Sequence, residues 1–285
     1  MTSSILFGIG ALILFGISDL IYKRAARAGI PTHQFLMVQS SLYTPPVVLY
    51  GWWTGTLDFP LVSLWGAVAA VFAFTGFYNF AYSLKGGAVS SNAAIFRLSF
   101  VLTALLGVVV LGEPLTGWKV AGWLLALVAV WLLLGGGNSV ASIDPKLRRS
   151  SLVRVCVATV AVGIANLLYK VGLNAGATPA ALLVVQAAMV VSMSTLLAYR
   201  IDGRIAPRSD TYRFAIVTSL LLALAFIFLM EGLARGEASV LVPIAQMGFV
   251  LTALLGFVFL REPMHGRNLL GLFFAVAALV SLARS

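Results

Sequence analysis

The sequence predicts an all-α integral membrane protein with ten transmembrane helices, arranged as two inverted five-helix repeats. Three observations lead to this prediction. The chain is 61% hydrophobic and only 10% charged, with a mean hydropathy of +1.02, which exceeds what the core of a soluble domain requires. The apolar residues form continuous runs rather than an alternating pattern, which excludes a transmembrane β-barrel. Finally, one long motif occurs twice.

The duplicated motif is Phe-Val-Leu-Thr-Ala-Leu-Leu-Gly, at residues 100–107 and again at 249–256. A Glu-Pro pair follows each copy at the same offset. Residues 16–29 and 163–176 form a second pair of related segments. We therefore predict a tandem duplication, with a first repeat at 1–135, a cytoplasmic connecting loop at 136–151 and a second repeat at 152–285.

The individual helices follow from the length of each apolar run, because about 20 apolar residues cross a bilayer as a helix. Gly, Pro and Asn punctuate the runs and mark the connections. The expected helices lie near 4–22, 33–54, 61–84, 88–111, 117–135, 152–171, 178–199, 212–234, 237–260 and 266–283.

An odd number of helices per repeat requires the two repeats to enter the membrane in opposite directions. The charges support this arrangement. The connections after the odd-numbered helices hold fourteen Lys and Arg residues, and the remaining connections and the C-terminus hold four. The positive-inside rule places the first set in the cytoplasm and both termini in the periplasm. It also explains the net charge of +10, so we expect no nucleic-acid partner.

The duplicated Leu-x-Glu-Pro element precedes the last helix of each repeat, as Leu111-Gly-Glu113-Pro114 and Leu260-Arg-Glu262-Pro263. Together with the ten helices, it resembles the drug/metabolite transporter superfamily and, within it, the EamA family. The resemblance implies a multi-pass transporter of the bacterial cytoplasmic (inner) membrane, with a central cavity, that exports amino acids or other small metabolites. An aromatic amino acid exporter is one such protein. Four-helix drug-exporting relatives carry a membrane-embedded Glu in helix 1, where this chain has Asp19.

Arg97 is the clearest candidate for substrate binding. It lies nine residues into the fourth helix, about 14 Å along its axis, and its counterpart in the second repeat is Gln246. An ionisable residue near the middle of the bilayer is costly and therefore indicates function. A guanidinium there suits a substrate carboxylate. The alternative is a structural arginine that pairs with carbonyl groups or with an acidic residue of a neighbouring helix.

The third helix offers an aromatic and partly polar face. Tyr78 and Tyr82 lie four residues apart, beside Asn79, and the corresponding helix of the second repeat contains Phe226. Such a face suits an aromatic or large apolar amino acid. Lipid-facing aromatic residues and an interfacial tyrosine belt are the alternative.

Other polar residues are weaker candidates. Ser91, Gln39 and Gln186 either contact substrate or form interhelical hydrogen bonds. Pro243 either frees backbone carbonyls for a ligand or simply kinks its helix. Asp19 and Glu231 are candidates for coupling or gating, but both are expected toward the ends of their helices. Because no acidic residue is expected at mid-membrane, the sequence favours facilitated diffusion or exchange over proton-driven transport.

The sequence contains no arrangement typical of an enzyme, a metal site or a cofactor site. We therefore expect a non-enzymatic transporter, a monomer, with no metal and no cofactor. Its expected mechanism is alternating access between the repeats, and its expected substrate is an aromatic or large apolar amino acid. The alternatives are a channel, or a flippase or exporter of the same fold for lipid or another metabolite such as a drug, nucleobase or sugar.

Overall fold

The computed structural model describes residues 2–83, 89–134, 145–260 and 266–285. Within these ranges every regular element is helical, which confirms the predicted fold class. The first half contains α1 (Thr2–Arg27), α2 (Thr32–Trp53), the short 3₁₀ helix η1 (Leu61–Leu64), α3 (Trp65–Ser83), α4 (Val89–Arg97), α5 (Ser99–Leu111) and α6 (Gly117–Leu134). The second half contains α7 (Pro145–Asn174), α8 (Pro179–Asp202), α9 (Ser209–Arg235), α10 (Ala238–Gln246), α11 (Gly248–Leu260) and α12 (Gly266–Ala283).

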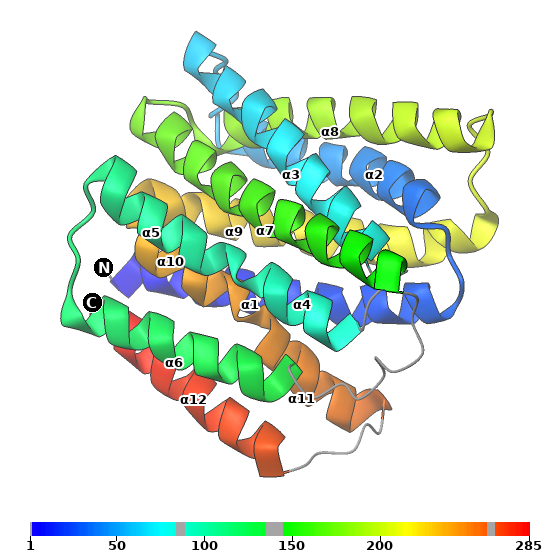
Figure 1. The fold of residues 1–285 in the computed structure, drawn as a ribbon. Helices are drawn as coiled ribbons and strands as arrows, with labels where there is room; N and C mark the ends of the chain where they lie inside the picture. The colour runs from blue at the N-terminus through cyan, green and yellow to red at the C-terminus, as the bar shows by residue number, and fades with distance from the viewer. Residues whose placement is uncertain (1, 84–88, 135–144, 261–265) are drawn as a thin grey trace.

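These helices account for ten passages through the molecule, because α4 with α5 and α10 with α11 each make one passage. Nine segments of the described chain are long and apolar enough to cross a membrane. The tenth passage is α2, whose 22 residues include polar side chains and two consecutive prolines and which packs against α8 and α9. Both termini lie at the same end of the molecule (Figure 1), as an even number of passages requires.

Two details differ from the sequence-based expectation. The fourth and ninth helices were expected to be continuous, but the structure interrupts them after Arg97 and after Gln246. At both positions the backbone makes a tighter turn, with Leu98 N bonded to Ile95 O and Met247 N bonded to Ile244 O. In addition, α7 begins at Pro145 rather than at residue 152, so the end of the expected connecting loop is helical.

The duplicated motif forms a reciprocal contact between the repeats. Thr252 of α11 donates a hydrogen bond to the carbonyl of Gly16 in α1, at 3.0 Å. In the mirrored contact, Thr103 of α5 donates to the carbonyl of Gly163 in α7, at 3.2 Å. A Cβ on Gly16 would lie 2.7 Å from the carbonyl oxygen of Gly248, so only glycine allows this close crossing. The repeated residues thus join the two halves at two equivalent crossings.

The end of the molecule that carries the termini is held together by polar contacts. The buried Glu113 carboxylate accepts hydrogen bonds from the amides of Ala238 and Ser239, at 2.7 and 2.8 Å. It therefore caps the N-terminus of α10 and complements its dipole. Lys119, which is 1% exposed, pairs with Glu237. These contacts connect the α5–α6 turn to the α9–α10 turn.

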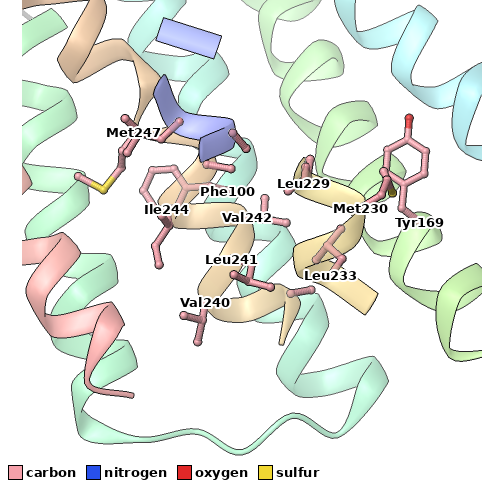
Figure 2. Packing of buried hydrophobic residues seen from close by; sticks show 14 of the residues in the cluster. Phe100, Tyr169, Leu229, Met230, Leu233, Val240, Leu241, Val242, Ile244 and Met247 are labelled. Carbon is pink, nitrogen blue, oxygen red and sulfur yellow. The ribbon is translucent and has the colours of Figure 1, made fainter. Parts of the chain in front are cut away.

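Helix α10 lies at the centre of the core. All its residues from Ala238 to Ala245 are buried, as expected for a helix that is apolar on every side. Figure 2 shows its side chains, from Val240 to Ile244, among Phe100 of α5 and Leu229, Met230 and Leu233 of α9. The interruption after Gln246 therefore lies at the end of a helix with no lipid-facing surface.

Candidate functional site

The two helix interruptions meet in the middle of the molecule. Figure 1 shows α10 entering from the end that carries the termini and α4 entering from the opposite end. Arg97 is the last residue of α4, and Gln246 is the last residue of α10. Both side chains therefore leave their helices at carboxyl ends, where the helix dipoles favour a cation.

Arg97 connects three helices. Its Nη2 pairs with the Asp19 carboxylate of α1, and its Nη1 donates to Gln246 Oε1 at 3.0 Å. The guanidinium also lies over the Phe249 ring, 5.8 Å from its centroid. The Arg97 side chain is 15% exposed and that of Asp19 is 33% exposed. The ion pair is thus partly enclosed.

The structure gives Asp19 a partner that the sequence did not indicate. Asp19 was expected near the basic end of the first helix, leaving no acidic residue at mid-membrane. In the structure, α1 continues to Arg27, and Asp19 pairs with the arginine at the interruption of the fourth passage. The structural alternative considered for Arg97, pairing with an acid on a neighbouring helix, is therefore what the geometry shows.

A second polar contact lies one turn further along α1. Tyr22 donates its hydroxyl to Gln39 Oε1 of α2, and the Gln39 carbonyl accepts from Ser219 of α9 at 3.0 Å. The Gln39 amide nitrogen is buried without a hydrogen-bond partner among the described residues. Because buried polar groups are normally paired, this unpaired nitrogen is a candidate contact for a ligand.

An aromatic cluster adjoins the ion pair. The Phe226 ring of α9 contacts three other rings edge to face: Phe15 at 5.5 Å, Tyr43 at 6.1 Å and Tyr169 at 6.4 Å between centroids. The hydroxyls of Tyr43 and Tyr169 are buried and have no partner among the described residues. Phe15 precedes Asp19 by four residues and so lies on the same face of α1. We call Phe15, Tyr43, Tyr169 and Phe226 the aromatic cluster.

The other candidates from the sequence have different neighbours. Tyr50 donates to the Glu231 carboxylate, which also pairs with Arg235 near the end that carries the termini. Pro243 lies within α10, three residues before the interruption. Gln186 of α8 is buried, and its Oε1 has no partner in the described part of the chain. The side chain of Ser91 lies outside the described residues.

Asn79 and Tyr82 contact Arg154 of α7. Asn79 Oδ1 accepts a hydrogen bond from Arg154 at 3.1 Å, and the Arg154 guanidinium lies 4.2 Å from the centroid of the Tyr82 ring. Tyr78 stacks on Phe74 of its own helix. The participation of Tyr78, Asn79 and Tyr82 in substrate binding remains a prediction.

Sequence reasoning missed Phe15, Tyr22, Tyr43, Tyr169 and Phe249 as neighbours of the site. Aromatic residues are common in membrane helices, so their presence alone indicates little. The duplication contained a signal for two of them, because Tyr22 and Tyr169 occupy the same position of the second repeated segment.

Chemically, the arrangement offers a cation, a carboxylate and an adjoining aromatic surface with unpaired hydroxyls. This combination suits a molecule that carries both charges and an apolar group. Among the described residues, no group of His, Cys, Asp and Glu side chains could hold a metal ion.

Comparisons with known proteins agree with this architecture. The sequence profile of the EamA-like transporter family matches residues 2–135 and 149–284. A solved structure titled "Crystal structure of protein" superposes with a TM-score of 0.84 at 17% identity, covering 99% of this chain and 96% of that chain, which shows a shared fold. A structure of the sodium-calcium exchanger NCX_Mj aligns at 12% identity over 99% of this chain and 96% of that chain, but its TM-score of 0.17 carries no argument. The sequence has no match among curated proteins.

Proposed function

Because the chain belongs to the EamA-like transporter family, we propose that it carries amino acids with aromatic or large apolar side chains across the cytoplasmic membrane. The substrate moves by alternating access through the centre of the molecule, between the two repeats. With the basic connections in the cytoplasm, both termini are periplasmic.

The observation that carries this proposal is the partly exposed Asp19–Arg97 ion pair at the two helix interruptions. An amino acid is a zwitterion, so it can exchange partners with this pair: its carboxylate binds Arg97 and its ammonium group binds Asp19. Every buried charge then keeps an opposite charge throughout, which avoids the large cost of an unpaired ion in the membrane interior. A substrate with only one charge would leave one side chain unpaired.

The aromatic cluster supports the choice of side chain. Phe15 lies on the same face of α1 as Asp19, so a zwitterion that pairs with Asp19 can direct its side chain toward Phe15 and the rings that contact Phe226. Offset and edge-to-face contacts favour an aromatic group there. The unpaired tyrosine hydroxyls can accept or donate one further hydrogen bond.

The same pairing favours facilitated diffusion or exchange. Asp19 pairs with Arg97 in the structure, and in the proposed complex it pairs with the substrate ammonium group, so it keeps a cationic partner that disfavours its protonation. In a cell with the higher internal concentration of the amino acid, the carrier then moves it outward.

Counterflow in proteoliposomes tests the proposal. Vesicles are loaded with unlabelled phenylalanine and offered one of three labelled compounds: phenylalanine, phenylethylamine, which lacks the carboxylate, or phenylpropionate, which lacks the amine. We expect uptake of phenylalanine alone, with the same rate in the absence and presence of a pH gradient. Arg208→Ala, which breaks the exposed Arg208–Asp210 pair, is the matched control and should retain this uptake.

Two outcomes contradict the proposal. Equal uptake of phenylpropionate would show that Asp19 does not select an ammonium group. No uptake of phenylalanine or other amino acids by folded protein would shift the assignment to lipid or to another class of metabolite.

A further inference from the structure

A basic groove lies on the outer surface of the molecule, away from the ion pair. It has a volume of about 480 Å³ and follows the first turns of α7 where they pass the end of α3. Its lining includes Lys146, Arg149 and Arg154, together with Ser150 and two valines. No acidic residue lines this groove in the part of the chain that the structure describes. We call these residues the α7 groove.

The groove spans the expected boundary between lipid headgroups and hydrocarbon. The apolar span of α7 begins at Arg149, so Lys146 and Arg149 lie at the membrane surface. Arg154 lies five residues further along, about 7 Å deeper at about 1.5 Å per residue. Val153 and Val157, which are 57% and 44% exposed, continue the groove as an apolar surface toward the membrane interior.

Arg154 is held in a fixed orientation without a compensating charge. Its Nη1 donates to Asn79 Oδ1, and its guanidinium stacks on the Tyr82 ring. Among the described residues, no carboxylate forms an ion pair with Arg154. A guanidinium has five N–H donors, so most of its donors remain available to an anion. A cation at this depth is costly unless an anion approaches it.

We propose that the α7 groove binds the phosphate of an anionic phospholipid, with the headgroup on Lys146, Arg149 and Arg154 and an acyl chain along Val153 and Val157. Phosphate is the anion that three clustered basic side chains bind well. The continuation into exposed valines favours a lipid over a soluble phosphate, because only a lipid brings an apolar chain attached to the phosphate.

Binding is measured on the purified full-length chain in detergent micelles, by native mass spectrometry and by the shift in melting temperature on adding lipid. Phosphatidylglycerol, phosphatidylcholine and inorganic phosphate are compared. We expect phosphatidylglycerol to bind and to raise the melting temperature, and the other two to have little effect. In Arg149→Gln/Arg154→Gln the affinity for phosphatidylglycerol should fall about 30-fold, since each basic residue near the surface contributes about a factor of five.

Two further variants keep the test decisive. Arg200→Gln removes an exposed basic side chain of α8 at the same end of the molecule and should retain the wild-type affinity. Arg154→Lys keeps the charge and should lose much less affinity than the double variant. If Arg200→Gln weakens binding as much as the double variant does, the attraction is diffuse and the proposal fails. An equal response to inorganic phosphate would identify a soluble-anion site instead of a lipid site. Because the readout is lipid binding and not uptake, the result is independent of the transported substrate.

Discussion

At the two helix interruptions the first repeat carries Arg97 and the second carries Gln246, while the helices that cross them carry Asp19 and Asn166 at equivalent positions. The backbone arrangement is the same in both halves, down to the threonine–glycine contacts at the crossings. The charged residues, in contrast, differ between the two halves. Both charges of the ion pair belong to the first repeat, and the second repeat contributes neutral groups to it, Gln246 and the ring of Phe249.

The same contrast holds one turn further along. Tyr22 bonds to Gln39 in the first repeat, whereas in the second the Tyr169 hydroxyl and Gln186 Oε1 are buried without partners in the described part of the chain. The duplication therefore supplied two copies of a scaffold, and the polar chemistry then became asymmetric. Two copies of Arg97 and Asp19 would have doubled the buried charge, at a large cost in the membrane interior.

The largest expected effect on stability comes from making the first repeat resemble the second. Asp19→Asn and Arg97→Gln should each destabilise the protein by about 3 kcal/mol, because each leaves one buried charge unpaired. The double variant should lose less stability than either single variant, since it places at these positions the same neutral residues, Asn and Gln, that the second repeat has at 166 and 246. Thermal or denaturant unfolding of all four proteins measures this coupling. Losses that simply add would show that the two side chains do not depend on each other.

The next effect concerns α10, whose N-terminus Glu113 caps. Glu113→Ala should lower the free energy of unfolding by about 2 kcal/mol, because two buried amides lose a charged acceptor. Asp210→Ala is the control, since Asp210 also lies in the first turn of a helix, α9, but is exposed. It should change stability by less than about 0.5 kcal/mol. If both variants lose a similar amount of stability, Glu113 does not stabilise the protein by capping α10.

A smaller effect tests the equivalence of the two crossings. Thr252→Val and Thr103→Val each remove one interhelical hydrogen bond, which is worth about 0.6 kcal/mol in a membrane protein. Thr103→Val should lower the free energy of unfolding slightly more than Thr252→Val, because the Thr103 hydroxyl also accepts a hydrogen bond from Asn166 at 3.4 Å. The same unfolding assay measures both variants. If one variant loses much stability and the other loses none, the crossings are not energetically equivalent.

The smallest effect is expected for Pro243→Ala. The first repeat has Ala94 at this position and is nevertheless interrupted after Arg97, so proline is not required for the interruption. Uptake should therefore change by less than about twofold, because tolerated substitutions away from special contacts shift energies by about 0.5 kcal/mol or less. A strong loss of uptake by folded Pro243→Ala would show that the two interruptions have different causes.

The sequence allowed the fold to be predicted because the duplicated residues are those that join the repeats. Thr103, Thr252, Gly16 and Gly163 recur at fixed spacing, and they meet at the crossings. The interruptions after Arg97 and Gln246 could not be predicted in this way. Each follows a polar residue in an otherwise apolar run, which does not by itself predict a tight turn.

The site was only partly predictable for a related reason. Spacing along a helix shows which residues share a face, but not which helix that face meets. Tyr78 and Tyr82 lie on one helix as expected, yet Tyr82 packs against Arg154 of α7. Asp19 was expected near the basic end of its span, and it does lie near the end of the apolar segment Ser3–Tyr22. Its partner became visible only once α1 and α4 were placed together.

Counterflow of labelled phenylalanine by wild-type protein and Arg97→Ala, reconstituted at equal amounts, tests the central claim most directly. The account predicts that Arg97→Ala lowers uptake about 100-fold, as expected when one partner of a buried charged contact is removed. Gln246→Ala, which removes only a neutral partner, should lower uptake less than about tenfold. Wild-type uptake by folded Arg97→Ala would contradict the account, because the substrate carboxylate would then have no need of the guanidinium.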